Sequence, residues 1–510
     1  MQKYRAILRI FILLLIIQFT VRAQAQLMNH YWAQSYNSIS SLLSGAVVAG
    51  DAGPSSIYYN PANISELTHG TNLSVAASFL TLNYYSFNNA LGDGIDLSTT
   101  NFYVQPQFFS MSFNSPDNKI SFEIATFTRI RERLSMTYGN SEYDNFTEIN
   151  TITERHTTAY HSRNDYDDSW LGIGGAYSVT DDFSVGLSLL FSSSTLNYYF
   201  DLSAMLNSFA DSIGDIPPDA SNIFAENAYM ENVKFTNIRF VSKIGLSYKK
   251  GNWSFGLNFT TPALNIFTTG KSAERLQREL YSADEQTSIR TNYLIYDIQK
   301  DDEIKANYKL PFSVALGIIY DLAQRNQRFY ATFEFFAGLK PYKMIDATIN
   351  DQITSKPIYD QMENKDWLSF AYGASPILNL ALGYQWLIRK DLLFMMGLRT
   401  DFNNKNNLDL KELSSYNVIK TTDYNIYHAT GGVQFHFKKH LLVAGTQLSF
   451  GYKGNQEQMA NFNDKENLDF EAPLPLFGVK QNVMDTYYFS ISVFLGATLN
   501  FEKKEKAPQD

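Results

Sequence analysis

Residues 487–501 read YYFSISVFLGATLNF and alternate between two kinds of side chain. Successive side chains of a β-strand point to opposite faces, so the alternation predicts a strand with one lipid-facing wall and one lumen-facing wall. The apolar wall consists of Tyr487, Phe489, Ile491, Val493, Leu495, Ala497, Leu499 and Phe501. The small or polar wall contains Ser490, Ser492, Gly496, Thr498 and Asn500.

The same period of two recurs along the chain. The apolar positions are rich in Phe, Leu and Tyr and nearly free of charge, as contact with hydrocarbon requires, whereas a soluble sandwich would carry many charges on its polar face. The pattern therefore favours a membrane barrel. Clear examples are the segments 253–260, 312–320, 378–385, 429–437 and 442–452.

The connections alternate in length, which predicts the topology. Six short links and seven long polar segments imply about 14 strands, with short turns in the periplasm and long loops outside. Lipid offers no partner for an open edge, so the first strand, near 72–87, must pair with the last. The short links lie at 115–118, 180–182, 249–252, 323–327, 389–391 and 438–440. The long segments are 88–101, 139–167, 201–234, 272–305, 345–369, 403–425 and 453–485.

Composition excludes several classes of protein. A formal net charge of -9 argues against a nucleic-acid partner, because binding a polyanion needs a basic face. Aromatic residues make up 15% of the chain, which favours strands and membrane-interface girdles. With no cysteine, disulfides and thiolate metal sites are excluded, and no cofactor is predicted.

The N-terminus resembles a secretory signal peptide. Lys3, Arg5 and Arg9 precede the apolar run 10–17, and Ala23-Gln24-Ala25 supplies the small residues of a cleavage site. The alternative is a membrane anchor, for which the apolar run is short. We therefore expect residues 1–25 to be removed and the chain to be exported to the cell outer membrane.

The segment 26–70 has the composition of a compact plug rather than a strand. Glycines and alanines between 44 and 53 allow close backbone packing, and they are followed by Tyr59-Asn60-Pro61-Ala62 and Leu67. We expect this segment to be a hatch inside the lumen, residues 71–501 to form the transmembrane β-barrel, and residues 502–510 to form a charged periplasmic tail. The fold class is therefore all-β, an antiparallel barrel with an internal plug.

The Gly/Ala-rich stretch and the Tyr-Asn-Pro-Ala motif resemble the FadL family of outer-membrane transporters for hydrophobic compounds. The resemblance implies a monomer without enzymatic activity, which takes up long-chain fatty acids or other hydrophobic molecules by a passive, plug-gated route. It also implies an outer groove, a deeper pocket, and a kink in the third strand that opens a lateral exit into the lipid. Asn60, Pro61 and Ala62 would then form a stiff gate, although an Asn-Pro turn is also an ordinary local structure.

Ligand-binding candidates come from one loop and from the predicted lumen faces. In the loop 201–234, apolar residues at roughly helical spacing could form a hydrophobic ligand groove, or they could simply pack the loop onto the rim of the barrel. Arg239 or Arg399 could hold a ligand carboxylate, or belong to salt-bridge networks that fix the plug together with Glu123, Lys243 and Glu334. The remaining candidates, which would suit an acyl chain, are Leu206, Phe209, Phe336 and Met395.

Other readings have weaker support. A phospholipase would need a Ser/His pair on the lipid face, but His428 and His436 fall on a predicted lumen face, and no Ser/His pairing is apparent from the sequence. Metal binding by His156, His161 and the run 165–168 competes with a solvated loop. The plug argues against an open porin. The principal alternative is a protein-interaction barrel of the same superfamily, such as the type IX secretion shuttle.

Overall fold

The computed structural model describes residues 27–32, 36–67, 71–115, 119–144, 146, 153–208, 224–282, 293–347, 368–406, 417–420, 422–438, 440–464 and 476–501. The expected signal peptide, the C-terminal tail and Phe209 lie outside these ranges. Within them, no helix is long and apolar enough to cross a membrane.

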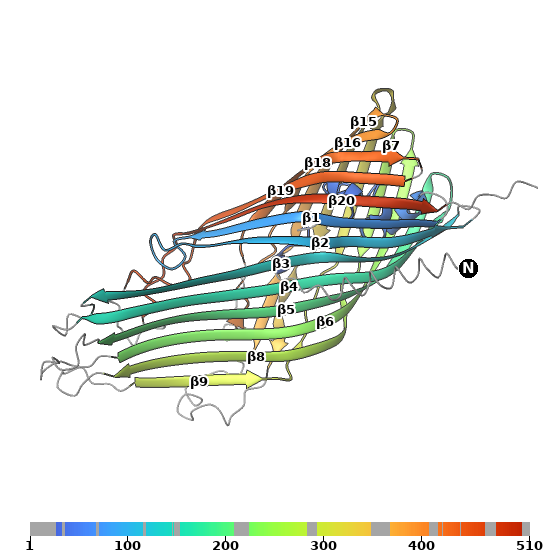
Figure 1. Ribbon diagram of the computed structural model, residues 1–510. Coiled ribbons are helices and arrows are strands. Elements are labelled where there is room, and N and C mark those ends of the chain that lie inside the picture. The colour runs from blue at the N-terminus through green and yellow to red at the C-terminus, as the bar shows by residue number, and fades with distance from the viewer. Residues whose placement is uncertain are drawn as a thin grey trace, which may run out of the picture.

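Fourteen antiparallel strands close into the predicted barrel (Figure 1). The first strand pairs with the last from Thr71↔Phe501 to Asn88↔Asp485, so no strand edge is left open at the seam. In order around the ring, the strands are β1 (Thr71–Asn88), β2 (Leu97–Asn114), β3 (Ile120–Asp144), β4 (Glu154–Ser178), β5 (Phe183–Ser208), β6 (Phe224–Lys250), β7 (Trp253–Thr260), β11 (Ser313–Leu322), β12 (Gln327–Phe336), β15 (Ile377–Arg389), β16 (Leu392–Asp401), β18 (Asn425–Phe437), β19 (His440–Gln456) and β20 (Met484–Phe501).

The predicted faces are confirmed. Along β7, the outward side chains of Trp253, Phe255, Leu257 and Phe259 are 38–46% exposed, whereas the inward Asn258 is buried. On β20, Phe489 and Leu495 are exposed while Ser490 and Asn500 are buried. This exposed apolar band is the surface that a transmembrane barrel presents to lipid.

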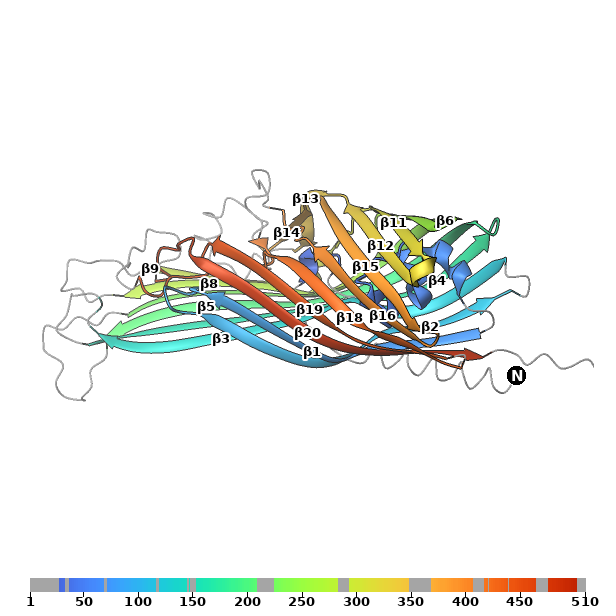
Figure 2. The same ribbon diagram turned by 90° about the horizontal axis from the view of Figure 1, so that it is seen from above.

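The four predicted short links that lie wholly within the described residues, 180–182, 249–252, 323–327 and 389–391, connect neighbouring strands as expected, but three predicted long loops are strand over most of their described residues. The strands β3 to β6 are 25–27 residues long and extend on the loop side beyond the shorter strands β11, β12, β15 and β16 (Figure 2). Their outer faces are polar there, so the hydropathy alternation fades although the backbone continues as sheet. The prediction of helical spacing in 201–234 is therefore wrong for residues 201–208, which belong to β5, and His156 and His161 lie on β4 rather than in a loop.

The long sheet also branches. The loop-side part of β6 pairs with β8 (Leu264–Ser282), which in turn pairs with β9 (Tyr293–Asp301), while the turn-side part of β6 pairs with β7. A second, four-stranded sheet contains β10 (Lys305–Ala306), β13 (Leu339–Asp346), β14 (Phe370–Ala374) and β17 (Asn417–Val418). A short 3-10 helix, η4 (Ala323–Arg325), makes the turn between β11 and β12.

The described residues between 27 and 67, here called the plug, lie inside the barrel and are almost entirely buried. Asn37 caps the first α-helix, because its side chain accepts a hydrogen bond from the Ile39 N–H. Pro54 and Pro61 each stand at the start of a 3-10 helix. The plug elements are η1 (Leu27–Asn29), α2 (Ser38–Leu42), η2 (Gly53–Ser55), α3 (Ser56–Tyr59) and η3 (Pro61–Glu66).

The plug rests on eight wall glycines that form four cross-strand pairs: Gly186↔Gly245, Gly256↔Gly317, Gly383↔Gly397 and Gly432↔Gly445. We call these eight residues the glycine belt. Between the first two pairs the register steps by two residues, since Gly245 faces Asn258 rather than Gly256, and such steps keep a ring level while the strands tilt. Glycine in a strand allows another backbone to approach closely, and here that backbone is the plug.

Candidate ligand site

The N-terminal end of the plug is held by two buried carboxylates of the wall. Asp401 pairs with His30 (Nδ1–Oδ2, 3.1 Å) and accepts a hydrogen bond from the Trp32 N–H. Glu334 accepts one from the Trp32 indole Nε1 at 2.7 Å and one from Ser313 at 2.6 Å. Buried carboxylates are costly unless they are satisfied in this way, so these contacts fix the segment in one position.

Asn60 joins two parts of the plug to the wall. Its Nδ2 donates to the Val48 carbonyl at 2.8 Å and to the Leu246 carbonyl of β6 at 3.0 Å, and its Oδ1 accepts from the Ala62 N–H. Pro61 lies so close to the wall that a Cβ built on Gly186 would be 2.2 Å from the Pro61 carbonyl carbon. The three predicted gate residues therefore sit directly on the glycine belt.

The turn-side end of the plug is held by ion pairs. Asp51 accepts hydrogen bonds from Arg328 (2.9 Å) and Tyr330 (2.7 Å), and Glu66 pairs with Lys249 at 2.9 Å. The Arg328 and Lys249 side chains are 39% and 48% exposed, so solvent screens these pairs more than the buried ones.

Most of the predicted lumenal charges take part in internal networks. Arg239 donates to Asp168 at 3.0 Å and stacks on the Tyr308 ring, and Asp168 also pairs with Arg129 at 2.6 Å. Lys243 lies 4.2 Å from the centroid of the Tyr58 ring of the plug. Arg399 is buried, with its Nη2 3.4 Å from the Gln447 Oε1.

A cavity of about 870 Å³, here called the upper cavity, lies on the loop side. One wall is apolar and aromatic and comes from the long strands, with Leu134 and Met136 on β3, Tyr160 on β4, and Phe200 and Leu202 on β5. None of the five ligand-binding candidates within the described residues lines it. Phe336 instead stacks on Tyr31 of the plug, and Leu206 is buried on β5.

The facing wall of the upper cavity carries lysines, Lys405, Lys420, Lys453 and Lys480. Lys420 pairs with Glu231 at 2.8 Å and lies over the Phe200 ring, and Lys453 pairs with Asp423 at 2.7 Å. Burial lowers the pKa of Lys405, which the negative charge of Asp423 partly offsets. With Glu457 also in the lining, four ammonium groups and three carboxylates meet here among the described residues, which leaves one positive charge in that set.

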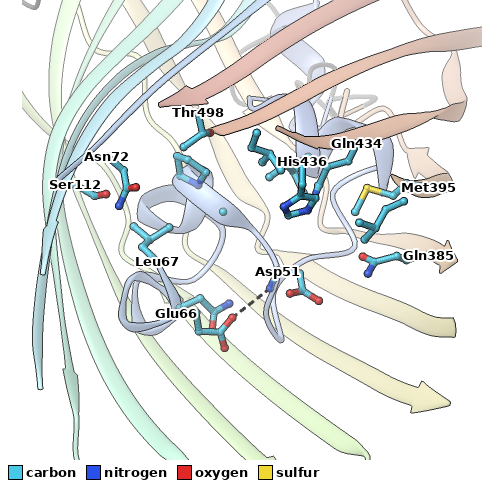
Figure 3. Close-up of a pocket in the computed structure, with 16 residues that line it drawn as sticks. Asp51, Glu66, Leu67, Asn72, Ser112, Gln385, Met395, Gln434, His436 and Thr498 are labelled. Atoms are coloured by element: carbon cyan, nitrogen blue, oxygen red, sulfur yellow. Dashed lines mark hydrogen bonds between the residues drawn. The ribbon is translucent and has the colours of Figure 1, made fainter. Parts of the chain in front are cut away.

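A second cavity of about 330 Å³, here called the lower cavity, separates the plug from part of the wall on the turn side (Figure 3). Its lining mixes polar and apolar side chains, and the Asp51 N–H donates a hydrogen bond to Glu66 at its edge (3.3 Å). Its lining includes one ligand-binding candidate, Met395. The wall residues facing the plug here include Asn72 of β1, Ser112 of β2 and Thr498 of β20.

The wall splits between β2 and β3. These strands pair only over Phe108–Asn114 and Ser121–Phe127, and β3 has a bulge between Thr128 and Ile130. Beyond that point, the side chain of Asn101 on β2 donates to the Arg133 carbonyl of β3. Inside the split lies a cluster of aromatic rings from wall and plug, namely Tyr36, Tyr58, Phe108, Phe127 and Trp170.

A Ser/His contact does exist, contrary to the sequence analysis. His428 Nδ1 lies 2.7 Å from Ser449 Oγ, but both side chains are buried in the lumen, and both contact the Gln447 side-chain amide rather than a carboxylate. A nucleophile needs access to substrate and an oriented base, so this pair does not form a hydrolase site. Among the described residues, no group of three or more His, Asp or Glu could hold a metal ion.

Sequence reasoning missed the glycine belt and the lysine wall. The belt had a readable signal, because single glycines recur in mid-strand on the polar faces, as in Ser-Phe-Gly-Leu at 254–257 and Ala-Leu-Gly-Tyr at 381–384. The lysines lie in separate loops or strand ends and have no common local pattern.

No protein-family model and no curated protein matches the sequence. The structure, however, resembles solved outer-membrane channels along almost its whole length. The Pseudomonas putida toluene transporter TodX matches with a TM-score of 0.52 at 13% identity, covering 92% of this chain and 98% of that one. A Pseudomonas aeruginosa FadL homologue matches with a TM-score of 0.50 at 11% identity, covering 94% and 100%. The chain therefore has the fold of the FadL-type outer-membrane channels for hydrophobic compounds.

Proposed function

We propose that this chain is an outer-membrane channel for the passive uptake of hydrophobic molecules with one anionic head group, of which long-chain fatty acids are the simplest. The observation that carries the proposal is the upper cavity, in which an apolar wall faces a lysine wall with one positive charge in excess. Its volume of about 870 Å³ falls in the range of small-molecule pockets.

The apolar residues and the lysines of the upper cavity would contact different parts of the ligand. Burial of an acyl chain against Leu134, Met136 and Phe200 contributes about 0.8 kcal/mol per methylene group. The head group would be met by Lys405 and Lys453, which flank Asp423. A neutral aromatic hydrocarbon, such as the toluene named for TodX, gains nothing from these lysines.

The route onward would be lateral. Leu134 and Met136 lie on β3, a few residues beyond its bulge, so the apolar wall leads along β3 to the split between β2 and β3. The aromatic cluster inside the split would receive the acyl chain, and breaking the Asn101–Arg133 hydrogen bond would help to widen the exit. In this proposal, residues 1–25 direct export, segment 26–70 is the hatch, and Asn60, Pro61 and Ala62 hold it on the wall.

The test is binding of radiolabelled palmitate and methyl palmitate to the protein in lipid nanodiscs. We expect palmitate to bind at least tenfold more tightly, and Lys405→Gln to reduce palmitate binding at least about tenfold without affecting the ester, since a hydrogen bond to a charged group contributes about 1.5–3 kcal/mol. Lys390→Gln, in an exposed turn on the opposite side, is the matched control. Equal affinity for acid and ester would contradict the anionic head group, and no saturable binding of either would contradict uptake.

A further inference from the structure

A third cavity, of about 30 Å³ and here called the central cavity, lies where the plug meets the wall. Its lining includes Tyr31 and Tyr58 of the plug, Arg129 of β3, Trp170 of β4 and Lys243 of β6. The Tyr58 and Trp170 ring centroids are 5.8 Å apart, and the Lys243 ammonium lies 4.2 Å from the centroid of Tyr58. The Arg129 guanidinium carbon lies 5.9 Å from the centroid of Trp170. Two cations and two aromatic rings therefore surround a space that admits a body the size of a water molecule.

Two buried N–H donors of this lining have no hydrogen-bond acceptor among the described residues. They are Nη2 of Arg129, whose Nε donates to Asp168, and the indole Nε1 of Trp170. The Lys243 ammonium donates to Thr260 at 2.9 Å and carries two further protons. Guanidinium, indole N–H and ammonium groups cannot accept hydrogen bonds, so these groups cannot satisfy one another. A buried donor without an acceptor is costly, which indicates that an acceptor from outside the chain binds here.

The charges around the central cavity also leave a positive excess. Arg129 and Arg239 share the carboxylate of Asp168, at 2.6 Å and 3.0 Å. The charged groups that act on Lys243 are Glu334, which attracts its ammonium, and Arg129, which repels it. Both oxygens of Glu334 already accept hydrogen bonds, as described above. Among the described residues, this group contains three cations and two carboxylates, each at most 6% exposed, so one buried positive charge is in excess.

We infer that the central cavity binds one monoatomic halide ion, chloride under ordinary conditions. An anion accepts hydrogen bonds from the unpaired donors and compensates the excess charge. A water molecule would satisfy the donors but leave that charge uncompensated, which is costly in a buried site. A carboxylate with an acyl chain is too large for this volume. Because Tyr31 and Tyr58 form the plug side of the cavity, the ion is enclosed only while the plug is in place.

The test is anomalous X-ray diffraction from crystals of the full-length protein equilibrated with a series of bromide concentrations, with gluconate keeping the ionic strength constant. We expect a bromide peak in the central cavity, within hydrogen-bonding reach of Arg129 and Trp170. Trp170→Phe keeps an aromatic ring but removes the N–H, so it should raise the bromide concentration for half occupancy at least about tenfold, as expected for a hydrogen bond to a charged group. Lys243→Gln, which removes the excess charge, should abolish the peak.

Matched controls are Trp386→Phe, at an exposed tryptophan, and Lys250→Gln, at the exposed turn-side end of the strand that carries Lys243. Both should bind bromide as the unmodified chain does. Folding is checked by heat-modifiable gel mobility. If Lys243→Gln does not fold, Trp170→Phe decides the test, because it changes no charge.

Absence of bromide from the central cavity at saturating concentrations would overturn the inference, because a water molecule would then be the acceptor. Equal bromide occupancy in Trp170→Phe and in its control Trp386→Phe would show that the proposed donors do not hold the ion. Displacement of bromide by palmitate would also contradict a halide site, because the cavity would then take the carboxylate of the transported ligand.

Discussion

The seating of the plug on the glycine belt can be tested with a single methyl group. In Gly186→Ala, the new Cβ would stand 2.2 Å from the Pro61 carbonyl carbon, whereas carbon atoms in contact normally lie about 3.5–4.0 Å apart. The plug backbone must therefore move away from β5 by more than about 1 Å. The Asn60 Nδ2 bond to the Leu246 carbonyl, now 3.0 Å long, lies next to this contact and would be lost.

The cost of Gly186→Ala can be estimated from these two effects. Overpacking of a well-packed site costs about 1–3 kcal/mol, and the lost hydrogen bond adds about 1 kcal/mol. A total of about 2–4 kcal/mol corresponds to a roughly 30- to 1,000-fold rise in the fraction of molecules with a displaced plug. The barrel wall itself keeps its hydrogen bonds, because alanine is compatible with a strand.

The assay is hydrogen exchange of the plug, with ion conductance in planar bilayers as a second readout. Plug amides at 44–64 should exchange 30-fold faster or more in Gly186→Ala while β19 and β20 stay protected, and steady conductance should rise. The control is Gly431→Ala, a mid-strand glycine whose added Cβ would meet nothing within 4 Å. If plug exchange in Gly186→Ala matched that of Gly431→Ala, the belt would not be what seats the plug.

Three further predictions follow from other contacts. Because burial lowers the pKa of Lys405, its ammonium group loses its proton at a lower pH than an exposed lysine does. The affinity for hexadecyl sulfonate, whose head group does not titrate, should therefore fall as the pH rises through the alkaline range. Lys405→Arg should remove this loss of affinity, and a loss that persisted in the variant would point to another titrating group. Trp32→Phe removes the 2.7 Å hydrogen bond to buried Glu334 and should destabilise the plug by about 1.5–3 kcal/mol. The measurement is faster amide hydrogen exchange at residues 28–32, with Trp386→Phe at an exposed tryptophan as the control. Unchanged exchange would show that this hydrogen bond does not anchor the plug. The chain has no cysteine, so the double variant Asn101→Cys/Arg133→Cys can be joined selectively across the β2–β3 split by a short thiol cross-linker. Cross-linking should suppress palmitate uptake by cells, whereas cells with the same variant left uncross-linked should take palmitate up. Palmitate uptake that continued after cross-linking would exclude the lateral route.

Sequence patterns predicted the barrel because lipid imposes a simple rule on it. Wherever a strand faces hydrocarbon, as at Trp253, Phe255 and Leu257, every second residue must be apolar, and the turns between such strands are short enough to read directly. Strand segments that extend beyond the lipid do not need an apolar outer face, so the alternation no longer marks them. Along 201–208 the outer face of β5 is mostly polar, so the sequence predicts a loop there, although the inner face, including Leu202 and Leu206, stays buried.

The candidate site was harder to predict because its parts are distant in sequence. Lys405 and Lys453 approach Asp423 only because the loop that follows β16 meets the loop-side end of β19. The arginines chosen from the sequence, Arg239 and Arg399, do point into the lumen, as the alternation required. Their partners, however, depend on which strands and which plug residues face them, and alternation within one strand carries no information about that.

The belt and the split occupy different sectors of the barrel, and this arrangement limits where a ligand can pass. The belt glycines belong to β5, β6, β7, β11, β15, β16, β18 and β19, and at these glycines the plug backbone or its Leu42 and Leu43 side chains meet the wall directly. The lower cavity borders β1, β2 and β20 and also the turn-side parts of β15, β16, β18 and β19, whereas the split adjoins β2 and β3. None of the belt glycines belongs to β2 or β3, so the lateral route proposed above could open without breaking a belt contact, and the plug need not leave the barrel for a ligand to pass.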